Sequence, residues 1–269
     1  MISKMKNLII ISILSLSIIS GCKRDKLRNL NEKASSINPN DMESVLNSLG
    51  YGYDALLHIS ASNGITQPGG NCKAQFYNSN NSLVSVGSLT VNSENVPKLT
   101  GNVYDISQRY YSSGGSFNPL TAIQSMMGQS IQIHLAGDTF GYPSYDTVAA
   151  MPPMIVGANF TSTTSRQITS TSSIPLTWTG GSSNDEYMFL ELRWLKKSSN
   201  LGSSYISSYG VWIDDNGSYT IPNSVVSQFD PSGDIMIYLH RYRAYEFYVN
   251  GRTFVVIGQA SRAFGAFYY

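Results

Sequence analysis

Residues 187–195 read Tyr-Met-Phe-Leu-Glu-Leu-Arg-Trp-Leu, and every second side chain in this stretch is large and apolar. Successive side chains of a β-strand point to opposite faces, so the alternation gathers these residues on one face. They are Met188, Leu190, Leu192 and Trp194. Because a large apolar face must be covered by another layer of the protein, the stretch predicts a strand with one side packed against a core.

Other short runs rich in β-branched and aromatic residues surround this strand in the C-terminal part of the chain. They are residues 174–178, 209–213, 218–221, 235–239 and 253–257. Asp214-Asp215-Asn216-Gly217 separates the second run from the third, and Asn-Gly tolerates the positive φ of hairpin turns. We therefore expect a β-hairpin there. About seven short strands with such spacing are typical of an Ig-like β-sandwich.

The N-terminal half also has the pattern of strands, with clusters of Gly, Asn, Ser and Pro between them. Residues 131–135 alternate cleanly between apolar and polar side chains. Met151-Pro152-Pro153 indicates a domain boundary, because a proline pair cannot donate to a central ladder and stiffens a connection. The predicted fold class is all-β, with two tandem Ig-like β-sandwich domains at residues 45–150 and 154–269.

The first 22 residues have the features of an export signal. Lys4 and Lys6 precede an apolar run that is too short to span a bilayer comfortably and that stops at small residues. Its end, Ser20-Gly21-Cys22, resembles a bacterial lipobox. That resemblance implies cleavage of residues 1–21 and lipid attachment to Cys22, so that the acyl chains hold the protein on a membrane. The alternative is an ordinary secretory signal.

Residues 22–44 are mostly polar and charged, and they predict a short flexible tether after the lipidated cysteine. Asp41 is placed to cap a short helical turn that Gly50 ends. Asp is absent from the position directly after Cys22, where Lys23 stands. The resemblance to lipoprotein sorting rules implies the outer membrane, on either its periplasmic or its surface face.

Three C-terminal segments carry a family resemblance. Residues 175–179, 215–222 and 233–241 resemble the C-terminal Ig-like module of uncharacterised envelope lipoproteins of the Bacteroidota. The resemblance covers the C-terminal domain and the lipobox. It implies a fold and a location in the cell envelope, and it supplies no active site.

Composition narrows the classes of partner. Cleavage after residue 21 removes Lys4 and Lys6 from 18 basic residues, which leaves 16 against 17 acidic ones. A nearly neutral chain gives no reason to expect a nucleic-acid partner. The charged fraction of 13% is low, as in secreted β proteins. Cys72 has no second cysteine beside Cys22, so we expect a buried, inert thiol rather than a disulfide or a nucleophile.

The chain lacks the common catalytic and metal-binding motifs. It contains no Gly-x-Ser-x-Gly elbow, Walker loop or HExxH sequence. The three histidines, His58, His134 and His240, have no acid or second histidine at metal-ligand spacing. Asp185 and Glu186 could be half of a glycosidase pair, but adjacent strand residues point opposite ways. We therefore expect no metal, no cofactor and no catalytic activity.

Two candidate sites remain. Tyrosine and arginine are enriched in recognition interfaces, and five of them gather in one stretch, where they form either a binding surface or ordinary strand packing. They are Tyr238, Arg241, Tyr242, Arg243 and Tyr245. Asp146-Thr147-Val148 resembles the O-glycosylation sequon of the Bacteroidota, which makes Thr147 a candidate for glycosylation in an exposed segment.

Two classes of function are compatible with these features. The first is a non-catalytic, membrane-anchored envelope lipoprotein that binds a glycan or protein partner or scaffolds an assembly. The second is an envelope hydrolase of glycans or peptides, whose active site is assembled only in space. We favour the first, because no nucleophile, base or metal set has a recognisable spacing.

Overall fold

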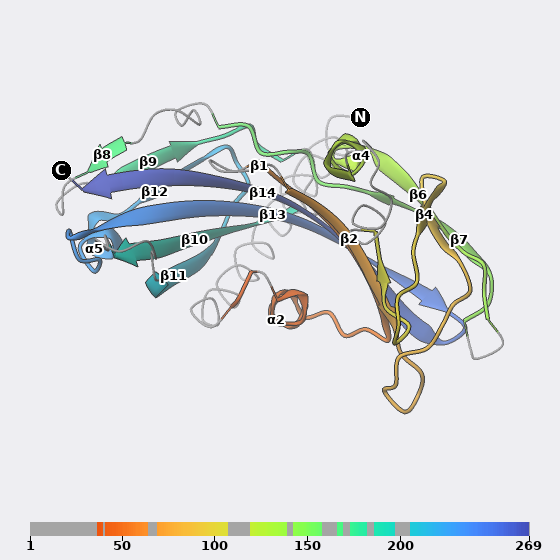
Figure 1. The fold of residues 1–269 in the computed structure, drawn as a ribbon. Helices are drawn as coiled ribbons and strands as arrows, with labels where there is room; N and C mark the ends of the chain where they lie inside the picture. Colours follow the sequence, from red (N-terminus) through yellow and green to blue (C-terminus); the bar gives the residue numbers. More distant parts are fainter. Residues whose placement is uncertain are drawn as a thin grey trace, which may run out of the picture.

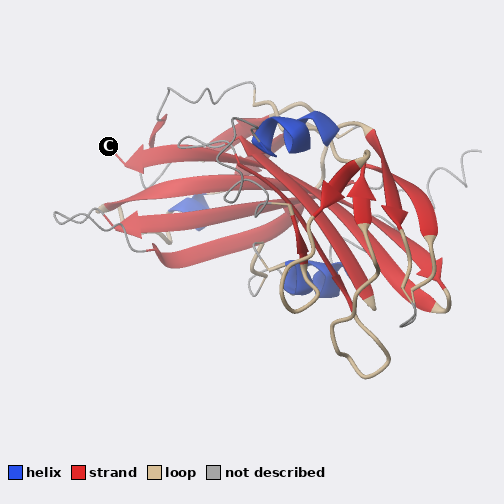
Figure 2. Ribbon diagram, turned by 45° about the vertical axis from the view of Figure 1, so that its right-hand side comes forward, coloured by secondary structure: helices blue, strands red, loops and turns tan. Residues whose placement is uncertain are grey.

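The structure is a computed structural model that describes residues 37–39, 41–63, 69–106, 119–138, 142–157, 166–168, 173–181, 186–196 and 205–268. Strands dominate these residues, and the helices are short (Figure 2). The all-β prediction is confirmed. The lipobox and Cys22 lie outside the described residues. In the described part of the chain, no helix has the length and apolar character that crossing a membrane requires.

One long sheet runs through the molecule, and two smaller sheets accompany it. The main sheet has the order β11 (Tyr205–Ile213), β10 (Glu186–Lys196), β13 (Gly233–Val249), β14 (Arg252–Tyr268), β1 (Ala55–Asn63), β2 (Gly69–Phe76) and β5 (Tyr104–Asp105), with β8 (Arg166–Ile168) beside β14. The second sheet has the order β4 (Glu94–Val96), β3 (Leu89–Val91), β6 (Ser130–Leu135) and β7 (Tyr145–Ala150). The third pairs β12 (Ser218–Ile221) with β9 (Ile174–Thr177).

The β13–β14 hairpin is the central element of the main sheet. Both strands have 17 residues, and they pair from Asp234–Phe267 to Val249–Arg252. The turn between them is Asn250-Gly251, and both residues have positive φ (52° and 75°). Positive φ at both central positions is the conformation for which an Asn-Gly pair is favoured in hairpins. This turn fixes the register of the longest strand pair in the protein.

Two cores lie side by side on one face of the main sheet. The first core packs β1, β2 and one end of β14 against α4 (Pro119–Met126) and the β4-β3-β6-β7 sheet. The second packs β10, β13 and the other end of β14 against the β9–β12 sheet and α5 (Asn223–Val226). The residues of β10 predicted to face a core, Met188, Leu190, Leu192 and Trp194, are all buried in the second core.

The opposite face of the main sheet is covered by α2 (Met42–Leu49), which lies across the hairpin from α4 (Figure 1). The Asp41 side chain accepts a hydrogen bond from the Glu43 amide at 3.2 Å, and Gly50 ends the helix with φ 81°. The helical stripe that contacts the sheet consists of Met42, Val45, Leu46 and Leu49. The predicted tether therefore ends before Met42, because the helix that begins there is packed into the protein.

The proline pair at residues 152–153 does not separate two independent sheets. β1, from the N-terminal half, pairs in parallel with β14, from Ala55–Phe254 to Asn63–Arg262. The chain at Pro152 crosses the main sheet at Gly258, where an added Cβ would overlap the proline ring. The predicted split into residues 45–150 and 154–269 is therefore not a division between separately folded sheets. The prolines stiffen a crossing segment instead.

The predicted hairpin at residues 209–221 is also wrong. β11 pairs with β10, whereas β12 pairs with β9 in another sheet. The segment between them is a corner at which the chain changes layers. Gly217 provides the positive φ (92°), and the Asn216 side chain accepts from the Ser218 amide at 3.1 Å. Gly217 thus has the positive φ that the sequence predicts, but Asn216 does not, and the turn connects two sheets instead of closing a hairpin.

Candidate functional site

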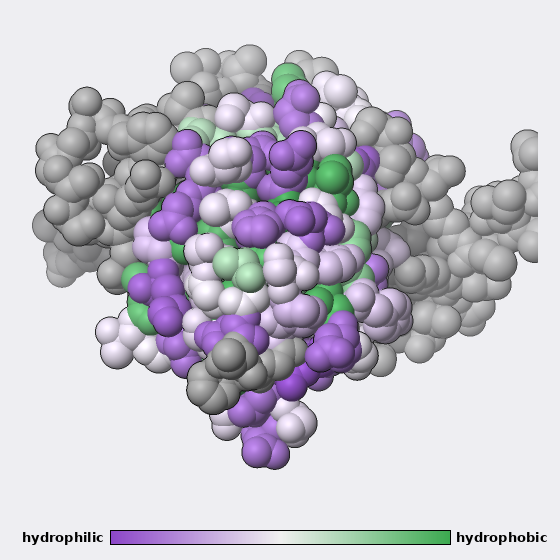
Figure 3. Space-filling model, turned by 90° about the vertical axis from the view of Figure 1, so that its right-hand side faces the viewer, coloured by the Kyte–Doolittle hydropathy of each residue, from purple (hydrophilic) through white to green (hydrophobic). Residues whose placement is uncertain are grey.

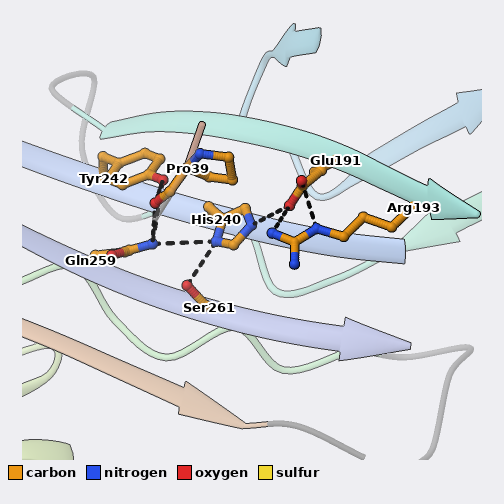
Figure 4. A network of polar contacts seen from close by, with 7 residues as sticks. All are labelled: Pro39, Glu191, Arg193, His240, Tyr242, Gln259 and Ser261. Atoms are coloured by element: carbon orange, nitrogen blue, oxygen red, sulfur yellow. Dashed lines mark hydrogen bonds and ion pairs between the residues drawn. The ribbon is translucent and has the colours of Figure 1, made fainter. Parts of the chain in front are cut away.

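A cluster of polar side chains lies on the α2 face of the main sheet. Figure 4 shows these residues, which we call the polar cluster: Glu191 and Arg193 on β10, His240 and Tyr242 on β13, Gln259 and Ser261 on β14, and the carbonyl of Pro39. Strand register brings them together, because His240 is directly opposite Ser261 and Tyr242 is opposite Gln259. Alternation along each strand points them away from the two cores.

The carbonyl of Pro39 fixes the orientation of the Gln259 amide. This carbonyl can only accept, and it faces the Tyr242 hydroxyl at 3.3 Å and Gln259 Nε2 at 3.4 Å. Gln259 Oε1 therefore points the other way, toward β1, where it accepts from His58 Nε2 at 2.9 Å. Gln259 thus links a histidine on β1 to the polar cluster.

The carboxylate of Glu191 assigns the tautomer of His240, because it can only accept and therefore favours the ring proton on the nitrogen that faces it. Nδ1 is then the accepting nitrogen. Gln259 Nε2 lies 3.3 Å from Nδ1, but it also faces the Tyr242 hydroxyl at 3.3 Å and the Pro39 carbonyl, so its two protons do not decide the tautomer. The Ser261 hydroxyl lies 2.9 Å from the same Nδ1 and donates to it. The ring proton of the neutral imidazole is therefore on Nε2, which faces Glu191 Oε2 at 3.6 Å. That separation is longer than a hydrogen bond and within the range of an ion pair.

Glu191 is shared between a histidine and an arginine. Arg193 Nε and Nη2 donate to its two carboxylate oxygens at 2.7 and 2.8 Å. The Arg193 guanidinium also lies 4.7 Å from the centre of the Tyr238 ring, which holds it in place. Burial would raise the pKa of Glu191, but His240 and Arg193 outweigh that effect and lower it. The carboxylate is therefore ionised at neutral pH.

Both histidines of this region are neutral at neutral pH. Burial lowers the pKa of His58 to about 4, although the hydrogen bond to Gln259 opposes the change. Burial also lowers the pKa of His240, against the attraction of Glu191. A neutral imidazole that accepts from a hydroxyl at one nitrogen and faces a carboxylate at the other can take up the hydroxyl proton.

The predicted Tyr/Arg binding surface does not exist as a surface. Arg241, Tyr242 and Arg243 are buried, and the two arginines point toward the cores rather than with Tyr242. Arg241 pairs with Asp215, and Arg243 pairs with Glu186. Only Tyr238 and Tyr245 of the five are half-exposed. The arginines satisfy carboxylates between the two cores, and Glu186 is held there as the partner of Arg243.

The other residues singled out in the sequence lie apart from the polar cluster. Cys72 is buried, and burial raises the pKa of its thiol to about 12, as expected for an inert thiol. His134 Nδ1 contacts Asp146 Oδ1 at 2.7 Å on the surface. Among the described residues, no group of three potential metal ligands comes together.

Thr147 lies in strand β7 rather than in a loop, and its side chain is half-buried. Glycosylation there stays a prediction. Comparison of the intact mass of the native protein with that of a Thr147→Ala variant tests it, because a glycan would add mass to the first alone. Equal masses, apart from the substitution, would contradict glycosylation at this position.

Sequence reasoning misses Glu191 and Ser261 as partners of His240. The three residues lie on three strands, and their spacing in the chain matches no motif. One signal was present: Glu191 and Arg193 alternate with the apolar residues of β10, so they had to lie on the face opposite the core. The strand neighbours that complete the cluster depend on the register of the β13–β14 hairpin.

Comparisons with known proteins add little to this geometry. No family model matches the chain, and no curated protein is significantly similar to it. One solved structure with some similarity is described as "Crystal structure of DIP-gamma IG1+IG2". The match has 8% identity and a TM-score of 0.19, and it covers 81% of this chain and 97% of that one. At that TM-score the likeness carries no argument about fold or function.

Proposed function

We propose that this protein is an outer-membrane lipoprotein, anchored through lipid on Cys22, that binds a partner polypeptide by strand addition along β7. The lipobox and the signal that precedes it support the anchor. The outer edge of β7, which pairs with no other strand among the described residues, is the observation that carries the binding role. Strand addition joins an extended segment of a partner to a sheet edge through backbone hydrogen bonds.

The register of β7 shows which of its backbone groups are available. The Met151 amide donates to the Gln129 carbonyl at 2.8 Å, and the two strands pair without a register shift. Because hydrogen-bonded pairs alternate in an antiparallel ladder, the backbone of Thr147 points toward β6. The amides and carbonyls of Asp146 and Val148 point away from it, toward the open edge.

Side chains leave this edge accessible. Val148 is 56% exposed, and the Asp146 side chain is 80% exposed. The end of the molecule that carries β6 and β7 is mostly hydrophilic, with isolated hydrophobic side chains (Figure 3). Natural proteins protect sheet edges with proline, bulges or lysine, and β7 has none of these. An unprotected edge with an exposed valine fits a partner strand.

Val148→Pro tests this proposal. Proline removes the outward amide of residue 148 without removing a donor of the β6 ladder, so β7 stays paired. A photo-crosslinking residue at Asp146 in intact cells is expected to give a discrete polypeptide adduct, which Val148→Pro abolishes and the matched Val148→Thr retains. The same crosslinker at exposed Ser232, directly before β13, is the location control, because β13 starts at the end of the molecule away from β7 (Figure 1). Strand addition would be contradicted if no adduct forms at Asp146. It would also be contradicted if the Val148→Pro variant gives the same adduct.

The anchor has its own test. Cys22→Ser is expected to abolish metabolic labelling with a palmitate analogue, because the thiol that accepts the lipid is gone. A chain that keeps the label after this substitution would disprove lipid attachment at Cys22. The result is independent of the crosslinking experiment.

A further inference from the structure

We propose that Ser261 is a nucleophile toward acyl esters, with His240 as its general base and Glu191 as the residue that positions His240. This inference goes beyond partner binding and does not depend on it. It rests on the line that the three side chains form across β14, β13 and β10 in the polar cluster (Figure 4).

The geometry matches what nucleophile activation requires. Ser261 Oγ lies 2.9 Å from His240 Nδ1, which is within hydrogen-bond reach of a base. His240 Nε2 faces Glu191 Oε2 at 3.6 Å, and such contacts are often loose without substrate. The ring proton on Nε2 faces Glu191, which leaves Nδ1 as the accepting nitrogen with its lone pair available to the Ser261 hydroxyl group.

The position of each residue on the sheet suits its role. His240 and Glu191 are only 4% and 6% exposed, whereas Ser261 is half-exposed. The reacting oxygen can therefore meet a substrate while the base and the carboxylate are shielded from water. Two of the residues beside Ser261 on this face are small, namely Ser62 in register on β1 and Ala263 two positions along β14, and the other two are His240 and Gln259. A substrate carbonyl group would approach the hydroxyl from the side of these two small residues.

The reaction balances with these groups alone. Ser261 Oγ attacks the ester carbonyl carbon while its proton passes to His240 Nδ1. The imidazolium, stabilised by Glu191, then gives that proton to the departing alkoxide, which leaves as an alcohol, and an acyl-serine remains. Water attacks the acyl-serine, its proton passes to Nδ1 and then to Ser261 Oγ, and the carboxylic acid is released.

A fluorophosphonate probe on the full mature chain tests the nucleophile. Attack by Ser261 forms an oxygen–phosphorus bond, fluoride leaves, and His240 takes the hydroxyl proton. Peptide mapping is expected to find the label on Ser261, and Ser261→Ala is expected to lose it. Ser62→Ala is the matched control, because Ser62 lies in register beside Ser261 without a histidine, and it should keep the label. No label on Ser261, or equal label on both serines, would overturn the proposal.

Variants of the other two residues separate catalysis from structure. His240→Gln is expected to slow labelling at least about 100-fold, the lower bound for general-base catalysis. Glu191→Gln is expected to slow it less and to preserve the labelled position. If His240→Gln does not fold, the pH dependence of labelling in the wild-type protein tests whether His240 acts as the base. An unchanged labelling rate in a folded His240→Gln variant would overturn the role of the histidine.

The labelling rate is expected to follow the protonation of His240. The ionisable groups that face it are Glu191 and Arg193 from β10 and the stacked rings of Tyr238 and Tyr242 from its own strand, and Gln259 and Ser261 on β14 are neutral. Burial lowers the pKa of His240, so the rate should stay constant down through the ordinary histidine pKa and fall only at lower pH. A rate that rises steadily with pH into the alkaline range would indicate an unassisted hydroxyl and would overturn the proposal.

Discussion

Arg241→Met removes a charge that the structure holds entirely out of water. The Arg241 side chain is 0% exposed and its partner Asp215 is 3% exposed. Arg241 also donates to the carbonyls of Pro153 and Thr179, at 2.9 and 2.6 Å. In the variant the Asp215 carboxylate keeps the Trp178 indole donor at 2.7 Å and loses its counter-charge. Methionine has a similar length and restores neither the charge nor the donors.

Breaking a buried ion pair by removing one partner costs about 3–5 kcal/mol, because the other charge stays buried without compensation. A typical domain has a total stability of about 5–15 kcal/mol, so the loss is a large part of it. Urea unfolding of the full mature chain, followed by tryptophan fluorescence, measures the difference. The double variant Arg241→Met/Asp215→Asn is expected to recover part of the loss, because it removes the uncompensated charge.

Lys73→Met is the matched control for this experiment. Lys73 pairs with Asp105 at 3.4 Å; the lysine side chain is 51% exposed and the Asp105 side chain 10% exposed. Because water already reaches the lysine end of this pair, its loss is expected to cost less than the loss of Arg241, and the control should unfold at a higher urea concentration than Arg241→Met. The reasoning is refuted if Arg241→Met costs no more than Lys73→Met.

Three further predictions concern pH, packing and truncation. His58 has a folded pKa of about 4, below its unfolded value of about 6.5, so the unfolded chain binds more protons between them. Stability should fall by up to about 1.4 kcal/mol per pH unit over that window as the pH drops, and His58→Gln should flatten a plot of urea midpoint against pH. Gly258→Ala should cost about 1–3 kcal/mol in the same assay, because its Cβ overlaps Pro152, whereas Gly52→Ala, with no atom within 4 Å, should be nearly neutral. Residues 154–269 expressed alone should not show cooperative thermal unfolding by circular dichroism, because β14 would lose β1 as its neighbour. A sharp transition would restore the two-domain interpretation.

Local patterns predict local features of this fold well. Alternation in residues 187–195 places four apolar side chains in a core, and Asp41 and Gly50 bound α2 as expected. Such local patterns do not predict which strands pair when they are distant in the sequence. Asn216-Gly217 and Asn250-Gly251 are the same dipeptide, yet only the second closes a hairpin, because β12 finds its partner in β9. Local turn chemistry permits a reversal, and tertiary packing decides which strands pair.

The candidate site also depends on strand pairing that local sequence patterns do not predict. Neighbours in sequence on β13 lie on opposite faces, so Arg241 and Arg243 separate from Tyr242 however compact the stretch appears in the chain. Alternation alone could have separated them. The contact of His240 with Ser261 and Glu191 needs the register of two strand pairs, and that register depends on a turn and on packing far from the site.

The parallel pairing of β1 with β14 gives this fold a high contact order. Among the described residues, β1 is the first strand and β14 is the last, and the hydrogen bond between His58 and Gln259 joins residues 201 positions apart. During synthesis, β1 lacks this neighbour until residues 252–268 have emerged, so the main sheet cannot be completed earlier. Closing so long a loop makes folding slow and leaves strand edges open to aggregation in the meantime.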